Sequence, residues 1–272
     1  MNPPIISSKW LANNINKTNI VVLEAITAKN KAAIDQKYGN NHIPNARIFD
    51  VKNVFSVLDS KFPNTLPNPA YFEKKCRELG INKTTEIVVY DKLGIFISPR
   101  VWWMFKVMGH KNVSILNGGM PSWISEGYTI TDILTDNYVC GDFKAKYNGD
   151  IYISFDELNR NLSTQESLVI DVRSNDRFLS KVPEPRKGLR SGHIPNSINI
   201  PYTELLDNGR LKSKEEINNI LENRIPTDKP LIFSCGSGIT ACIAYLALYQ
   251  ILENKKSVYD GSWTEWAQLS DL

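Results

Sequence analysis

Residues 231–241 read Leu-Ile-Phe-Ser-Cys-Gly-Ser-Gly-Ile-Thr-Ala, and this stretch decides the fold. The apolar run 231–233 predicts a buried strand, because short apolar runs bounded by turn residues are typical of strands covered on both faces. The glycines after Cys235 predict a tight loop, and the apolar residues that follow predict a helix running to about Leu252. Cys235 is therefore expected at the carboxyl end of a strand, where open parallel sheets bind their ligands.

The chain carries an internal repeat that includes this stretch. In the first copy, Asp91 stands at the position that corresponds to Cys235 in the second. Landmarks that recur in one order indicate a duplication. These are His-Ile-Pro-Asn at 42–45 and 193–196, the apolar strands 87–91 and 231–235, and the glycine turns with a following tryptophan at 117–123 and 260–266.

Within each copy, short apolar segments alternate with amphipathic segments, which predicts an α/β fold. We expect two similar domains, each with a mainly parallel sheet flanked by helices. The predicted strands are 20–23, 87–90, 114–116, 168–171 and 231–233, and the predicted helices are 31–38, 99–108, 121–126, 214–222 and one that begins after a capping box at 154–157.

Loop composition predicts where the domains meet. Residues 62–69 contain three prolines and read as a loop inserted in the first copy. The polar stretch 135–150 contains two glycines and shows little periodicity. We therefore expect a first domain at 1–142, a linker at 143–149 and a second domain at 150–272.

Composition excludes several classes of protein. With 272 residues, 42% hydrophobic and 22% charged, the chain is typical of globular domains that bury real cores. A net charge of +3 is too balanced for nucleic acid or an anionic membrane to be the main partner. The longest apolar run, 239–252, is shorter than the roughly 20 residues of a spanning helix.

Cysteine usage and the first residues indicate the compartment. The cysteines at 76, 140, 235 and 242 include no C-x-x-C pair, so neither a zinc knuckle nor a thioredoxin-type redox pair is expected. Residues 1–17 contain two prolines where a signal peptide needs an unbroken apolar stretch. We expect a cytoplasmic protein with free thiols.

Cys235 is the candidate nucleophile. Loop N–H groups and the positive end of a helix both favour a thiolate, so we expect a lowered pKa for its thiol. Cys76, Cys140 and Cys242 have no comparable setting and are expected to be ordinary free cysteines. Because Asp91 replaces the cysteine in the first copy, that domain is expected to be inactive.

Two reactions of nucleophilic cysteines are disfavoured. A cysteine phosphatase needs an arginine to close its loop around a phosphate dianion, and the sixth residue after Cys235 is Ala241. A cysteine–histidine hydrolase needs a histidine base, whereas His42 and His193 belong to the repeated turns and are expected to hold those turns.

The sequence resembles the tandem-domain rhodanese sulfurtransferases over nearly its whole length, and within them the members that use 3-mercaptopyruvate. The likeness lies in both His-Ile-Pro-Asn turns, in residues 98–105 and 184–186, in the loop 235–241 and in Tyr-Asp-Gly-Ser-Trp at 259–263. Thiosulfate-preferring relatives typically carry basic residues after the cysteine, whereas this chain carries Gly-Ser-Gly. The resemblance implies two rhodanese-like domains, an inactive first domain and an active site between them.

The same resemblance implies roles for single residues. Cys235 matches the nucleophile, Ser237 a loop serine, and Arg177 and Arg186 two arginines that bind the substrate carboxylate. Asp50 matches an aspartate proposed to assist proton transfer. From the residues alone the arginines could equally face solvent, Asp50 could cap a turn, and Ser237 could bond the loop backbone. The other loop residues expected to contact substrate are Gly236, Gly238, Ile239 and Thr240.

The expected reaction is a ping-pong transfer of sulfur. Cys235 takes sulfur from 3-mercaptopyruvate as a persulfide and releases pyruvate, and a thiol, cyanide or thioredoxin then accepts the sulfur. No metal or organic cofactor is expected. Two alternatives remain open: a thiosulfate sulfurtransferase on the same fold, and a non-catalytic sulfur-carrier or interaction protein.

Overall fold

The computed structural model describes residues 3–27, 37–134, 136–226 and 228–270. The chain divides into two compact units. The first comprises Met1–Leu58, Leu66–Asn148 and Asn208–Leu211. The second comprises Asp59–Thr65, Gly149–Asp207 and Lys212–Leu272. Residues 143–148, where we expect the linker, therefore lie with the first unit, and Phe143 there is buried.

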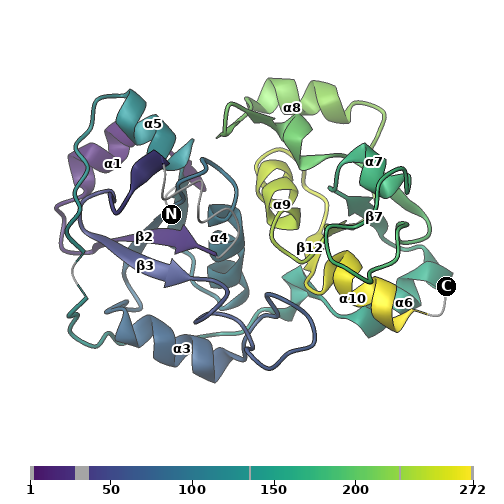
Figure 1. The fold of residues 1–272 in the computed structure, drawn as a ribbon, viewed down its shortest axis with the longest axis horizontal. Helices are drawn as coiled ribbons and strands as arrows, with labels where there is room; N and C mark the ends of the chain where they lie inside the picture. Colours follow the sequence, from purple (N-terminus) through teal and green to yellow (C-terminus); the bar gives the residue numbers. More distant parts are fainter. Residues whose placement is uncertain (1–2, 28–36, 135, 227, 271–272) are drawn as a thin grey trace. The chain divides into compact units, whose positions relative to one another are not determined.

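Figure 1 shows the fold, with strands β2 and β3 labelled in the first unit and β7 and β12 in the second. Each unit contains a five-stranded sheet with the same strand order. The first sheet has the order β1 (Ile5–Ile6), β5 (Val113–Leu116), β4 (Glu86–Tyr90), β2 (Ile20–Ile26), β3 (Ala46–Asp50). The second has the order β6 (Tyr152–Ile153), β12 (Lys256–Tyr259), β11 (Leu231–Ser234), β7 (Leu168–Asp171), β8 (Ser197–Asn199). All pairings within both sheets are parallel, which confirms the predicted α/β fold.

Helices connect these strands. In the first unit they are α1 (Ser8–Asn14), α3 (Pro69–Glu78), α4 (Ser98–Val107) and α5 (Gly119–Ser125). In the second they are α6 (Phe155–Thr164), α7 (Asn175–Phe178), α8 (Lys214–Leu221), α9 (Ala241–Tyr249) and α10 (Ser262–Leu269), with the 3₁₀ turns η1 (Gly149–Ile151) and η2 (Tyr202–Leu205). A separate two-stranded sheet consists of β9 (Leu206–Asp207) and β10 (Arg210–Leu211).

Two corresponding helices, α4 and α9, are buried along almost their whole length. All residues of α4 except Lys106 are buried, and all residues of α9 except Tyr249 are buried. A helix that is apolar on every side can only be stable inside the protein. Each of these helices follows the central strand, β4 or β11, so the loop between strand and helix is fixed at both ends.

The repeated His-Ile-Pro-Asn segment is a turn in both copies. Asn45 and Asn196 have φ values of +62° and +59°. The N–H of the next residue donates to the carbonyl of Ile43 or Ile194, at 3.2 Å in each copy. Proline followed by a residue with positive φ is the pattern of a type II turn, and asparagine tolerates that conformation well.

Most predicted elements are confirmed, with small differences at their ends. The capping box at Ser154 and Glu157 begins α6 as expected. The helix predicted to reach Leu252 ends at Tyr249, because residues 250–252 close it with irregular turns. Positions 31–36 of the predicted helix 31–38 lie outside the described residues. Within the described ranges, no helix is long and apolar enough to cross a membrane.

Candidate active site

Cys235 directly follows β11, and the loop 235–240 leads into α9. Its side chain is buried, with 2% of the residue exposed. Gly238 has a φ of +76°, which explains the glycine at that position. The loop 235–240 can therefore surround the sulfur, and α9 begins directly after these six residues.

The beginning of α10 holds this loop in place. The Ser262 hydroxyl accepts hydrogen bonds from the N–H groups of Cys235, at 3.1 Å, and Gly238, at 3.2 Å. The N–H of Trp263 donates to the Cys235 carbonyl at 2.9 Å, and the N–H of Thr264 donates to the Gly236 carbonyl at 3.1 Å. Unpaired N–H groups at a helix start are natural donors, so α10 fixes the outer side of the loop.

Hydrogen bonds to the sulfur shift the pKa of Cys235 downward. Burial alone raises the pKa of this thiol, but donors around the sulfur outweigh burial and lower it below its ordinary value. They are the Thr240 hydroxyl, the N–H groups of Ser237 and Ala241, and the Ser262 hydroxyl, which lies 3.8 Å from Sγ. Bonds to the charged form favour that form, so the loop is built to hold a sulfur anion.

Arg177 lies beside the loop. A Cβ added to Gly236 would come within 3.0 Å of Arg177 Nη2, so the guanidinium packs directly against this glycine. Glu184 accepts two bonds from Arg177, from Nε at 3.1 Å and from Nη2 at 2.5 Å. Glu184 also accepts from Arg173 Nη1 at 2.8 Å. This buried carboxylate therefore sets the orientation of Arg177.

Arg186 lies near the same sulfur. Its Nη1 donates to the Thr264 hydroxyl at 2.9 Å. Burial lowers the pKa of Arg186, the negative charge of Cys235 raises it, and the positive charge of Arg177 lowers it. The charges of Arg177, Arg186 and Cys235 thus influence one another, and an arginine can bind a carboxylate through paired hydrogen bonds.

Ser237 has a partner that the sequence does not predict. Asn64 Nδ2 donates to the Ser237 carbonyl at 3.0 Å and to its hydroxyl at 3.3 Å. Asn64 belongs to the segment 59–65, which packs with the second unit although it lies in the first copy of the repeat. Sequence reasoning also missed the contacts of Glu184, Ser262 and Thr264. It missed Tyr202 as well, whose pKa is raised by burial and by the charge of Cys235. Ser262 stands in the repeated landmark 260–266, the one signal that points to it.

The structure brings together most of the predicted site residues. Cys235, Ser237, Arg177, Arg186 and the loop glycines share the second unit with Ile239 and Thr240. The carbonyl of Ile239 accepts from the N–H of Cys242 and so helps to start α9.

Asp50 lies in the first unit, at the end of β3. Its carboxylate accepts from the N–H groups of Lys52, at 3.0 Å, and Asn53, at 2.9 Å, and from Asn53 Nδ2 at 2.8 Å. It thus caps a turn, as one interpretation of the sequence expects.

In the first unit, Asp91 fills the loop that corresponds to the cysteine loop. Its Oδ2 accepts from the N–H groups of Phe96, Ile97 and Ser98 and from the Ser98 hydroxyl, at 2.8–3.0 Å. Its Oδ1 accepts from the N–H of Leu93 at 2.9 Å. A carboxylate therefore occupies the place of the sulfur anion, and this loop carries no nucleophile.

The remaining cysteines are free and have ordinary settings. Cys76 is fully buried in α3, and burial raises its pKa well above the ordinary value. Cys242 lies inside α9 with its thiol toward the Gly238 carbonyl at 3.4 Å. Cys140 is exposed.

Comparison with known proteins places both copies in one family. A family model described as the rhodanese-like domain matches residues 7–126 and again 154–269. A 3-mercaptopyruvate sulfurtransferase of Escherichia coli is 36% identical over 275 residues, which cover 98% of this chain and 96% of that protein. A thiosulfate sulfurtransferase of Rattus norvegicus is also 36% identical, with 96% of this chain and 91% of that protein covered.

Solved structures of similar proteins superpose on this chain over nearly its whole length. The crystal structure of the Escherichia coli 3-mercaptopyruvate sulfurtransferase SseA superposes with a TM-score of 0.85 at 34% identity, covering 96% of this chain and 99% of that one. Tum1 of Saccharomyces cerevisiae superposes with a TM-score of 0.87 at 27% identity over the whole chain.

Proposed function

The chain belongs to the rhodanese family, and from this premise we propose that it is a sulfurtransferase that takes sulfur from 3-mercaptopyruvate on Cys235. The observation that carries the proposal is the ring of donors around Cys235 Sγ, from Ser237, Thr240 and Ala241, next to two arginines. The sulfur anion of Cys235 is stabilised, and Arg177 and Arg186 can bind a carboxylate. This combination suits a sulfur-donating substrate that carries both a thiol and a carboxylate.

In the first half-reaction the Cys235 thiolate attacks the sulfur of 3-mercaptopyruvate. The new S–S bond forms as the C–S bond breaks, and the electron pair of that bond stays on the carbon. The proton of the substrate thiol ends on this carbon, so pyruvate leaves and Cys235 holds a persulfide anion. Arg177 and Arg186 bind the carboxylate throughout, and the loop N–H groups bind the terminal sulfur.

In the second half-reaction an acceptor thiol attacks the terminal sulfur of the persulfide. The S–S bond breaks, the Cys235 thiolate returns, and the acceptor leaves with the extra sulfur. We propose small thiols, cyanide and thioredoxin as acceptors, with the reaction located in the cytoplasm. No step requires a metal or an organic cofactor.

Two of the assigned roles rest on the resemblance. Ser237 is proposed to assist proton movement at the substrate, and its hydroxyl is held by Asn64. Asp50 is proposed to assist the same proton transfer, although its contacts within the first unit are those of a turn cap. An Asp50→Asn variant whose pH profile matches that of the wild type would remove Asp50 from the mechanism.

A thiosulfate sulfurtransferase is the second candidate, because relatives with that activity are as similar as those that use 3-mercaptopyruvate. The Gly-Ser-Gly loop opposes it, since a small dianion needs a cation within the loop itself. A single-turnover experiment separates the two: the protein is incubated with equal concentrations of each donor, and the mass gain of one sulfur atom is followed. We expect faster adduct formation with 3-mercaptopyruvate, and faster formation with thiosulfate would reverse the assignment.

A further inference from the structure

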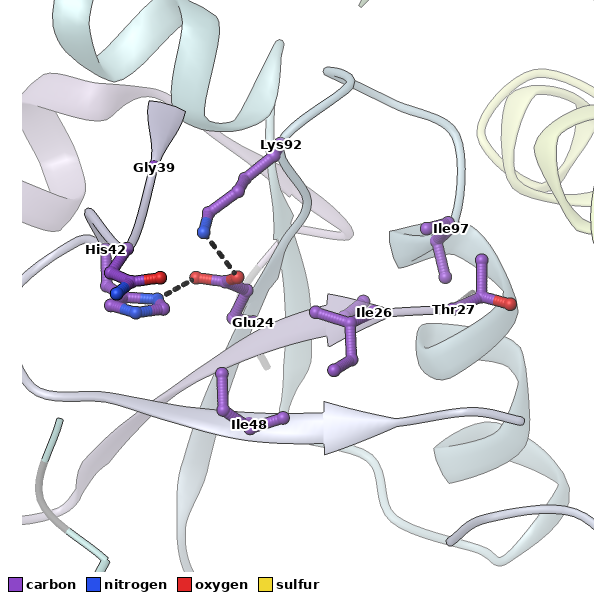
Figure 2. Close-up of a pocket in the computed structure, with 10 residues that line it drawn as sticks. Glu24, Ile26, Thr27, Gly39, His42, Ile48, Lys92 and Ile97 are labelled. Carbon is purple, nitrogen blue, oxygen red and sulfur yellow. Dashed lines mark hydrogen bonds and ion pairs between the residues drawn. The ribbon is translucent and has the colours of Figure 1, made fainter. Parts of the chain in front are cut away.

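The first unit contains a hollow that the proposed reaction does not use. It has a volume of about 180 Å³ and lies near the carboxyl end of β2 (Figure 2). This is far more than the roughly 10–15 Å³ that a single water needs. The lining residues, all in the described part of the first unit, come from β2 and its end, from residues 39–48 and from the loop after β4.

The strand register shows which residue of the second unit corresponds to Ile26 in this hollow. In the second unit Asp171 pairs with Ser234, the residue before Cys235. In the first unit Glu24 pairs with Tyr90, the residue before Asp91. Two residues further along, the second unit has Arg173, whose buried side chain bonds to Asp171 and Glu184. The first unit has the shorter side chain of Ile26 at that position, and Ile26 lines the hollow.

One end of the hollow is charged. Glu24, which is 1% exposed, accepts from Tyr90 at 2.5 Å, binds His42 Nδ1 at 2.7 Å and pairs with Lys92 Nζ at 3.1 Å. Burial raises the pKa of Glu24, but the bonds to His42 and Tyr90 and the charge of Lys92 outweigh it and lower the pKa. The Glu24 carboxylate thus already has hydrogen-bond donors. The Lys92 ammonium has three N–H groups, which is more than its pair with Glu24 requires.

The other end of the hollow is apolar. Figure 2 shows Glu24, His42 and Lys92 turned toward one another, with Ile26 and Ile97 away from them. Thr27 lies beside Ile97, and Ile48 lies opposite Glu24 in the strand register. The hollow therefore has an ammonium at one end and is lined by isoleucine side chains and Thr27 beyond it.

We propose that this hollow binds a short-chain monocarboxylate. Its carboxylate lies on Lys92, and its aliphatic part packs against Ile26, Ile48 and Ile97. Glu24 already bonds to Tyr90, His42 and Lys92, whereas Lys92 pairs only with Glu24 among the described residues, so its other N–H groups can bind an anion. The size fits, because an apolar cavity of about 150 Å³ takes up benzene. This proposal is independent of the reaction at Cys235.

The test uses 3-methylbutanoate with the full chain, carbon-13 labelled at the isoleucine δ1 methyl groups. We expect saturable shifts of the methyl signals of Ile26, Ile48 and Ile97. The neutral 3-methylbutanamide should bind at least about tenfold more weakly, the change expected for loss of a hydrogen bond between charged groups. Shifts confined to Ile239, in the cysteine loop, would mean that the acid binds the arginines instead and would overturn the proposal.

Variants locate the binding site. Lys92→Met should weaken binding of the acid by at least about tenfold. The matched control is Lys83→Met, which removes an exposed lysine of the same unit, paired with Asp142 at 3.6 Å, and should leave binding unchanged.

Because Lys92 neutralises a buried carboxylate, its loss can also unfold the unit, so a second variant is needed. Ile26→Trp fills the apolar end and keeps the ion pair, and it should abolish the methyl shifts of Ile48 and Ile97. Unchanged affinity in folded Ile26→Trp, or equal binding of the acid and the amide, would contradict the proposal.

Discussion

At the scale of single residues, the site depends on Ser262 as much as on the cysteine it supports. Ser262 has a φ of +50°, which is unfavourable for a residue with a side chain, and it is completely buried. Strain of this kind persists where the surroundings require it, and here one hydroxyl satisfies two loop N–H groups. The repeated landmark 260–266 marks the position of Ser262 but does not predict this role, because a serine in a Gly-Ser turn is ordinary in sequence.

We predict that Ser262→Ala shifts the pH dependence of activity. The donors around the sulfur favour the thiolate and lower the pKa of Cys235, so removing one donor raises that pKa. The thiolate fraction at neutral pH then falls, and the acidic limb of the kcat/KM profile moves to higher pH, with recovery in alkaline solution. A uniform loss of activity across the pH range would mean that Ser262 acts only on loop structure.

The arginines give a second prediction. If Arg177 and Arg186 each donate a charge-assisted bond of about 1.5–3 kcal/mol to the substrate carboxylate, then Arg177→Gln or Arg186→Gln should lower kcat/KM for 3-mercaptopyruvate by roughly 10- to 150-fold. Mercaptoacetone, which lacks the carboxylate, should be affected much less. An equal loss with both donors would show that the arginines maintain the structure rather than bind substrate.

At the scale of elements, the two strand–loop–helix segments have the same order of elements, but their loops surround different side chains. The segment after β11 surrounds a thiol, and the segment after β4 surrounds the carboxylate of Asp91. The repeat, the strands and the replacement of cysteine by aspartate were all predictable, because each is a local pattern. The bond between Asn64 and Ser237 was not, since it joins residues 173 positions apart.

We predict that Asp91→Ala destabilises the protein. The carboxylate satisfies four backbone N–H groups, and each buried donor left without a partner costs about 1–3 kcal/mol. The midpoint of urea unfolding should fall clearly, whereas Asp132→Ala, at an exposed position, should leave it unchanged. Equal midpoints for both variants would mean that water replaces the carboxylate without loss.

Donor preference is expected to depend on the loop residues 236 and 237. The double variant Gly236→Arg, Ser237→Lys places two cations beside Cys235, and its first side chain also displaces the guanidinium of Arg177, 3.0 Å from the added Cβ. Both effects favour a small dianion over a carboxylate donor. The ratio of kcat/KM for thiosulfate to that for 3-mercaptopyruvate should rise about tenfold, near 1.4 kcal/mol. If a folded variant has the same ratio as the wild type, the arginines and not the loop residues determine which sulfur donor is preferred.

At the scale of the whole molecule, a duplicated unit has diverged into two chemically different copies. The strand orders are the same, yet in the first copy Asp91 stands at the position of Cys235 and Ile26 at that of the buried Arg173. Sequence patterns predicted the duplication and the lowered pKa of Cys235. They did not predict the hollow, because its lining residues come from separate segments of the first unit that only the fold brings together.

The central claim is that sulfur travels on Cys235, and the mass of the protein after incubation with 3-mercaptopyruvate tests it most directly. Wild type should gain one sulfur atom that an acceptor thiol removes, and Cys76→Ser, whose thiol is buried in α3, should do the same. Cys235→Ser should remain folded and gain nothing, since a hydroxyl at neutral pH supplies no soft anionic nucleophile. A Cys235→Ser protein that still acquires the removable sulfur would contradict the account.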